Sequence, residues 1–171
     1  MRLVRNILIF LIALYVGIII FMPKSELYFY AEKELKKQGV VIDNEVLEPK
    51  IASLTIQHPV VYYQGVDVLR VAKLKITPLL FVNTVEADSI ELLNVAKQFL
   101  NINIDKLKLN HTVLKPFRVK LWAVGSFGEA NGFINLKQRV IHIDISKIKN
   151  INPIKRFLKK GAKGWYYESR F

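Results

Sequence analysis

The chain of 171 residues contains no cysteine. It can therefore form no disulfide, offer no thiolate to a metal ion and use no cysteine nucleophile. Small exterior domains of eukaryotes commonly rely on disulfides, whereas in the bacterial periplasm disulfides are optional. The composition fits a bacterial envelope protein better than a eukaryotic secreted module.

Motifs of known catalytic chemistry are missing too. Residues 125–128 read Gly-Ser-Phe-Gly, and because the serine follows the first glycine directly they do not form a G-x-S-x-G nucleophile turn. Residues 161–164 lack the upstream glycine and the hydroxyl residue of a phosphate-binding loop. The histidines show no H-x-x-x-H or H-E-x-x-H spacing, and each is expected at the surface: His58, His111 and His142.

Acidic residues gather in two short clusters. They are Asp43, Glu45 and Glu48, and Glu86, Asp88 and Glu91. Catalytic carboxylates need a cleft and environments that separate their pKa values, and at strand spacing such clusters usually mark a solvated face. We therefore expect no enzymatic activity, no catalytic residue, no cofactor and no metal ion.

One long apolar run is present, near the start of the chain. Sixteen apolar residues, Ile7 to Met22, follow Arg2 and Arg5 and precede Pro23. A spanning helix needs about 20 mainly apolar residues, and the run approaches this length with its apolar neighbours. A signal peptide has a similar basic start but ends in small residues at its cleavage site. The exit here, Ile-Ile-Phe-Met-Pro-Lys, has none, which favours an uncleaved anchor over a cleaved signal peptide.

Charges near the ends of the run bear on its orientation. Arg2, Arg5 and the amino terminus favour the cytoplasmic side, although four lysines follow the exit within a short distance. We expect the amino terminus inside and the bulk of the chain in the periplasm. The predicted location is the bacterial inner membrane, crossed once, with the lipid bilayer contacted through residues 7–22.

The net charge of +12 is concentrated at the other end of the chain. Residues 147–171 hold eight basic residues and one acidic residue. Basic side chains beside aromatic ones suit docking on another protein first, and anionic lipid headgroups second. A solvated tail is a further interpretation, and single-stranded nucleic acid is disfavoured outside the cell. The predicted partner-binding residues are Lys155, Arg156, Lys159, Lys160, Trp165, Tyr166 and Tyr167.

Periodicity predicts a short helix directly after the apolar run. Apolar residues recur at helical spacing over residues 25–38, with Ser25 as N-cap and Gly39 as stop signal. We expect this helix to pack on the domain. Two further segments are less regular: residues 94–100 fit a helical turn or a loop, and residues 154–160 fit a final short helix after Pro153.

From Val40 onward the pattern changes to that of strands. About seven to nine strands are predicted, with an interruption at Pro59 and the clearest hairpin joining residues 133–136 to 140–145. No alternation of strands with helices appears, so the fold is mainly β, an open, curved antiparallel sheet or half-barrel. The predicted divisions are a tail and anchor (1–23), a juxtamembrane helix (24–39), a periplasmic β domain (40–146) and a basic-aromatic tail (147–171).

Two stretches carry a family resemblance, "ASLTIQHPVVYYQGVDVLRVAKLKITPLLF" and "GEANGFINLKQRVIHIDI". With the anchor and the helix that follows it, they resemble the type II secretion protein N family and the wider AsmA-like envelope proteins. The matching residues are Pro23, Gly39, Gly65, Pro78, Leu79, Leu80, Gly132 and Leu136. The resemblance covers most of residues 1–146. It implies an inner-membrane anchor and a curved antiparallel sheet that faces the periplasm.

Two functions follow as expectations. The first is a non-enzymatic structural or assembly component of a multiprotein envelope machine of Gram-negative bacteria, such as a secretion system, a pilus-type apparatus or a flagellar motor scaffold. Its partners are other proteins of that periplasmic complex. The alternative, implied by the resemblance, is a lipid-handling module that shields an acyl chain in the curved sheet.

Overall fold

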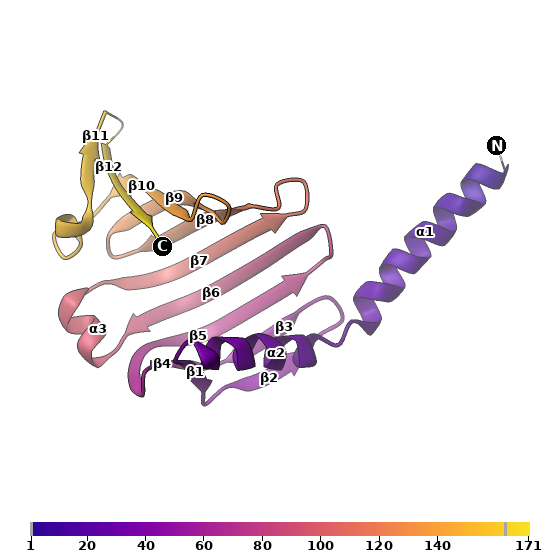
Figure 1. The fold of residues 1–171 in the computed structure, drawn as a ribbon, viewed down its shortest axis with the longest axis horizontal. Coiled ribbons are helices and arrows are strands. Elements are labelled where there is room, and N and C mark those ends of the chain that lie inside the picture. Colours follow the sequence, from indigo (N-terminus) through magenta and orange to yellow (C-terminus); the bar gives the residue numbers. More distant parts are fainter. Residues whose placement is uncertain (1, 163) are drawn as a thin grey trace.

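The computed structural model describes residues 2–162 and 164–171. Within them, helices lead into one antiparallel sheet of twelve strands that curves without closing on itself (Figure 1). The helices are α1 (Arg2–Phe21), α2 (Lys24–Lys37) and α3 (Asn94–Phe99), with a 3₁₀ turn η1 (Lys155–Phe157). The strands are β1 (Val40–Asp43), β2 (Val46–Pro49), β3 (Leu54–Gln57), β4 (Val60–Tyr63), β5 (Val66–Pro78), β6 (Val82–Leu92), β7 (Asn103–Thr112), β8 (Arg118–Gly125), β9 (Gly128–Asn135), β10 (Val140–Ile148), β11 (Lys159–Gly161) and β12 (Gly164–Arg170). The predicted fold class, mainly β with an open, curved sheet, is confirmed.

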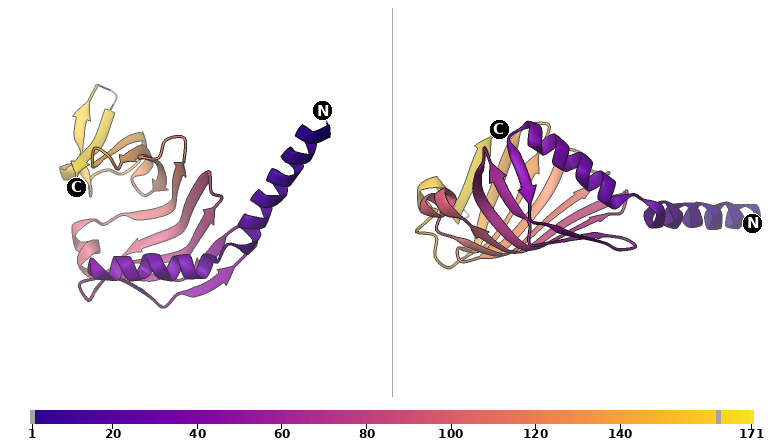
Figure 2. Two further views of the ribbon diagram at one scale, coloured as in Figure 1. Left: turned by 45° about the vertical axis from the view of Figure 1, so that its right-hand side comes forward. Right: turned by 90° about the horizontal axis from the view of Figure 1, so that it is seen from below.

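α1 projects from the sheet as a separate rod (Figure 2). Its 20 residues extend about 30 Å at 1.5 Å per residue, which is the thickness of a bilayer's hydrocarbon core. In the part of the chain that the structure describes, it is the one helix long and apolar enough to cross a membrane, and none of it is buried in the fold. A membrane anchor and a signal sequence both fit this description.

The junction between α1 and α2 is a compact turn. The Nζ of Lys24 donates to the carbonyl oxygens of Ile19 at 2.8 Å and of Met22 at 3.3 Å, which satisfies groups left unpaired at the end of α1. Pro23 stands at the N-cap of α2, and its carbonyl accepts from the N–H of Leu27 at 3.1 Å. The expected cap by Ser25 is wrong, because proline already sets a helical φ at this point and Ser25 lies inside the first turn.

α2 lies against the beginning of the sheet, as expected for a helix that packs on the domain. Tyr28 is its buried anchor, in contact with a cluster built on Leu54 and Ile56. The hydroxyl of Tyr28 donates to Glu45 at 3.4 Å, and burial raises the pKa of this phenol well above its usual range. The helix therefore covers one end of the concave face.

The strand order is β1-β4-β5-β6-β7-β8-β9-β10-β12-β11. Outside this order, β3 pairs with β5, and β2 pairs with β3. Pro59 separates β3 from β4, and both strands pair with successive parts of the long β5. Because proline cannot donate to a ladder, the break predicted at this residue is confirmed. The hairpin predicted around residues 133–145 is also present, as β9 and β10.

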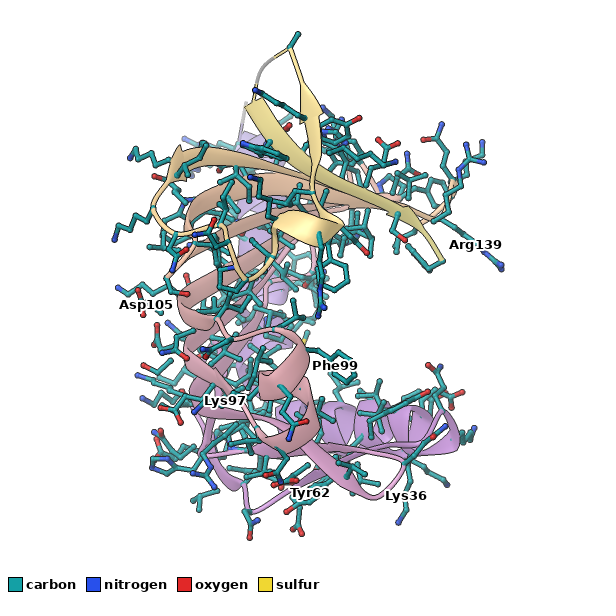
Figure 3. All side chains as sticks on the ribbon, turned by 90° about the vertical axis from the view of Figure 1, so that its left-hand side faces the viewer. Lys36, Tyr62, Lys97, Phe99, Asp105 and Arg139 are labelled. Atoms are coloured by element: carbon teal, nitrogen blue, oxygen red, sulfur yellow. The ribbon has the colours of Figure 1, made fainter. Side chains whose placement is uncertain are left out.

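The two faces of the sheet differ in chemistry. On the concave face, residues in cross-strand register form an apolar row: Leu74, Ala87, Leu107, Ala123, Ala130 and Ile145. On the convex face, neighbouring positions pair Lys75 with Glu86 and Glu86 with Lys108. The sheet has a C-shaped cross-section, and the side chain of Asp105 lies on its outer side (Figure 3).

The end of the chain differs from the expected helix and tail. Over residues 154–160 the helix is limited to the single turn η1, and the chain continues into β11 and β12. β12 pairs with β10, with Val140 opposite Arg170 and Asp144 opposite Tyr166. Gly164, at the start of β12, has a φ of 118°, a conformation that favours glycine. Strand pairing prevails because the apolar face of β12 packs on the sheet. The ambiguous segment near residue 94 is a helix, α3.

Candidate functional site

The concave face holds an apolar trough with a cavity of about 520 Å³. This volume lies in the range of small-molecule sites, about 300–1,000 Å³. Apart from one tyrosine, its lining side chains are aliphatic or phenylalanine. They come from the strands (Ile104, Leu107, Leu121, Ala123, Ala130, Ile143, Ile145, Tyr167), from the turn between β8 and β9 (Phe127), from the segment after α3 (Leu100, Ile102) and from the η1 region (Ile154, Phe157, Leu158). The site therefore suits an apolar ligand.

The floor of the trough depends on small residues in the middle of the sheet. Ala123 and Ala130 face each other across β8 and β9 and are 5% and 3% exposed. Beside them, a Cβ on Gly132 would lie 2.2 Å from the carbonyl oxygen of His142, so this strand position admits only glycine at the observed spacing. Small side chains at these points leave the hollow, and larger neighbours such as Leu107 and Ile145 form its sides.

One end of the trough is bounded by a contact between α3 and η1. The Nη2 of Arg156 donates to the carbonyl oxygen of Phe99 at 2.6 Å, although the two residues are 57 positions apart. Phe99 itself lies beside the hollow of the C-shaped section (Figure 3). Arg156 thus links the last turn of the chain to the middle of the sequence at this end.

The other end of the sheet lies next to α1. The hydroxyl of Tyr15 donates to the carbonyl oxygen of Leu79 at 3.0 Å, and its ring stacks on Phe81 with 5.6 Å between centroids. The connection between β5 and β6 is therefore in direct contact with the apolar helix. This contact sets the position of α1 relative to the trough.

The residues predicted to bind a partner do not share one face. Trp165 packs against the trough cluster and Tyr167 lines the cavity, whereas Tyr166, between them, lies on the convex side. The alternation of a strand separates them, since successive side chains point to opposite faces. The three aromatic rings therefore cannot act as one patch.

The predicted basic residues are likewise divided. The Nζ of Lys155 lies 5.6 Å from the ring centroid of Trp165. Arg156 makes the contact with Phe99 described above. Lys159 and Lys160 are exposed on β11, which lies at an edge of the sheet. A partner-binding role for these residues stays a prediction.

On the convex face, four side chains from four strands form a stacked row that sequence reasoning did not find. Arg118 lies 4.0 Å from the ring centroid of Phe133, Phe133 stacks on His142 at 5.6 Å, and His142 stacks on Tyr166 at 5.4 Å. The ring nitrogens of His142 also meet Glu168 at 3.0 Å and Asp144 at 3.3 Å. The row joins β8, β9, β10 and β12, so it stabilises the pairing of the terminal strands.

Two acidic residues of the convex face, Glu86 and Glu129, are paired with lysine. The Nζ of Lys108 donates to Glu86 at 2.7 Å, and this hydrogen bond lowers the pKa of the carboxyl group. Glu129 accepts from Lys147 at 2.7 Å and from the indole of Trp122 at 3.0 Å, which lowers its pKa in the same way. Both groups stay ionised at neutral pH and do not suit a general acid.

The three histidines lie at separate places. His58 is exposed before Pro59, His111 contacts the carbonyl oxygen of Pro116 at 3.0 Å, and His142 belongs to the stacked row. Among the residues that the structure describes, no group of three or more histidine, aspartate and glutamate side chains is arranged to hold a metal ion.

The chain was also compared with known proteins. Comparison with protein-family models, with curated proteins and with solved structures found no match to it.

Proposed function

We propose that this protein is a non-enzymatic, membrane-anchored module that holds the acyl chain of a lipid in the apolar trough. The observation that carries the proposal is the cavity of about 520 Å³ with its aliphatic lining. Burial of each methylene group contributes about 0.8 kcal/mol. Among the residues that the structure describes, none that lines the trough carries a charge to pair with an ionic ligand, so a headgroup would remain outside the trough.

The edge of the trough suits an anionic headgroup. Lys155 and Arg156 are exposed in η1, between the lining residues Ile154 and Phe157. Their positive charges can pair with a phosphate group, while the neighbouring apolar side chains contact the acyl chain of the same lipid. The large positive net charge of the protein acts in the same direction at longer range.

The proposal includes the location of the module. α1 would cross the bacterial inner membrane once, with its arginine end in the cytoplasm and the sheet in the periplasm. The length of α1 and the absence of buried residues among those described in it support this arrangement. The resemblance to AsmA-like envelope proteins agrees with it, since an anchored and curved antiparallel sheet is the plan that the resemblance implies.

Lipid bound to the purified protein tests the function. The full chain, extracted in detergent, should carry phospholipid that mass spectrometry identifies. Ala123→Trp places an indole on the floor of the trough and should abolish this lipid, whereas Val124→Trp, on the other face of the same strand, should not. Ile143→Asp, at a half-buried lining position, is a second trough variant.

Circular dichroism of each variant shows whether the sheet is intact. A folded Ala123→Trp or Ile143→Asp protein that keeps the lipid of the wild type would contradict the proposal. So would a wild-type protein that carries none.

A second candidate function, a structural part of an envelope machine, is favoured by the open edges of the sheet. β2 pairs with β3 alone, and β11 ends the strand order, so a partner strand can add to either edge. Crosslinking in native membranes should then capture a neighbour that the double variant Lys159→Glu, Lys160→Glu loses. Unchanged capture would remove β11 from this function.

A further inference from the structure

Two loops at the α1 end of the sheet carry exposed apolar side chains. Residues 79–81 join β5 to β6 and residues 113–117 join β7 to β8. Phe81 is 60% exposed, Leu114 is 90% exposed and Phe117 is 56% exposed. The turn between β4 and β5, at the opposite end of the sheet, holds Gln64 and Gly65. Exposed apolar side chains therefore lie at the end of the sheet next to α1, and a further one, Phe99, is exposed at the opposite end.

The two loops form one surface, which we name the apolar rim (residues 79–81 and 113–117). The N–H of Val113 donates to the carbonyl oxygen of Phe81 at 3.1 Å and so joins them. Leu80 adopts φ of 59°, a left-handed conformation that is uncommon for an aliphatic residue.

The apolar rim is fixed beside α1. Tyr15 bonds to Leu79 and stacks on Phe81, as described above. A hollow of about 420 Å³ separates the helix from the loop, and its walls are apolar, with Ile18 on α1 and Leu80 on the loop among them. Water makes few favourable contacts in such an apolar hollow, whereas the transfer of lipid acyl chains from water into it lowers the free energy.

The position of Tyr15 along α1 indicates how deep the apolar rim lies relative to the end of the helix. Tyr15 precedes the end of the helix at Phe21 by six residues, which is about 9 Å along the axis. A helix of this length fills the hydrocarbon core, so Tyr15 and the loop it touches lie below its outer boundary. In Figure 1 the connections β5–β6 and β7–β8 lie at the end of the sheet that faces α1, with β5–β6 nearer to the helix.

From this geometry we infer that the apolar rim inserts into the outer leaflet of the bilayer that α1 crosses. The inference rests on the proposed anchoring by α1. Apolar elements of peripheral proteins enter a bilayer by about 5–10 Å. Tyr15 lies about 9 Å from the end of α1, so its contact with the apolar rim places the rim in this range of depth. Lys115, exposed next to Leu114, and Arg118 at the start of β8 stand where anionic headgroups would pair with them. The protein is thus held in the membrane by α1, which crosses it, and by the apolar rim, which enters only the outer leaflet.

Spin labels in the full-length protein test this inference, because the chain has no cysteine of its own. Single variants Leu80→Cys and Leu114→Cys place labels on the apolar rim, Gln64→Cys places one in the turn at the opposite end of the sheet, and Ile9→Cys reports on α1. Each protein is reconstituted in vesicles of phosphatidylethanolamine and phosphatidylglycerol. Collision with oxygen, which enters the bilayer, is compared with collision with a water-soluble nickel chelate.

Labels at positions 80 and 114 should resemble the label at position 9, with frequent oxygen collisions and loss of most nickel collisions, and the label at position 64 should show the reverse. Labels at 80 and 114 that are as open to nickel as the label at 64, with position 9 inside the bilayer, would overturn the inference and leave the anchor intact. Shielding from both reagents would mean a protein contact and would overturn it too. Nickel access at position 9 would overturn the anchoring and the inference together.

Discussion

Glycine at position 132 allows β9 and β10 to lie close together beside the floor of the trough. An added methyl group would lie 2.2 Å from the carbonyl oxygen of His142 and 2.9 Å from the Cα of Ile143, and backbone atoms cannot yield as a flexible side chain can. The replacement would push β9 and β10 apart. The adjoining Ala130 and the other small floor residues would then lose their packing.

We predict that Gly132→Ala lowers the free energy of unfolding by about 1–3 kcal/mol, the usual cost of overpacking a close-packed site. Urea denaturation followed by circular dichroism measures the change. Asn131→Ala, on the neighbouring convex position, is the control and should change stability by much less. Equal stability of Gly132→Ala and the wild type would show that the strands separate at no cost.

At the scale of elements, α2 shows how one side chain fixes a helix to a sheet. Tyr28 is 6% exposed and contacts Leu54 and Ile56, whereas Tyr30, on the same helix, is 72% exposed. The pair offers identical chemistry in two environments. Burial, and not helix propensity, therefore decides how α2 is held.

Tyr28→Ala should destabilise the sheet by about 3 kcal/mol, the scale of aromatic truncation in a core. Tyr30→Ala should leave the free energy of unfolding within about 0.5 kcal/mol of the wild type, as is usual at exposed positions. Thermal or urea unfolding of the two variants, measured in one detergent, checks the difference. Similar losses for both would mean that Tyr30 is also covered, by a surface other than this chain.

Elements with a strong local pattern could be predicted from the sequence. Alternation at Ile141, Ile143 and Ile145 is local information, so the hairpin of β9 and β10 and its apolar face follow directly. The last strands could not be predicted in this way. Trp165, Tyr166 and Tyr167 form an unbroken aromatic run without alternation, and their division between two faces becomes visible only when β12 pairs with β10.

The trough itself depends on register, which is a non-local property. Ala123 lies opposite Leu107 and Ala130 only because β7, β8 and β9 pair as they do. A shift by one residue would turn each of these side chains to the other face. The contact of Tyr15 with Leu79 bridges 64 positions and has no signal in the local pattern.

For the whole molecule, an open sheet predicts an uneven distribution of stability. Central strands β6 and β7 are paired on both sides along most of their length, whereas β2 and β11 are short strands with one free edge. Hydrogen exchange of the full chain in detergent should therefore be slowest in β6 and β7 and fastest in β2 and β11. Uniform exchange rates would indicate that a further partner covers the edges.

If the trough holds a lipid as proposed, the open sheet also determines how that ligand exchanges. In a closed barrel, a long molecule must pass lengthwise through the mouth, and a mobile lid commonly controls the rate. Here the C-shaped section leaves one long side without strands (Figure 3), so an elongated molecule can move in and out sideways over its full length. Exchange through such a side needs no hinge and no gate. The rate of exchange then depends on the hydrophobic contacts that are lost along the length of the ligand.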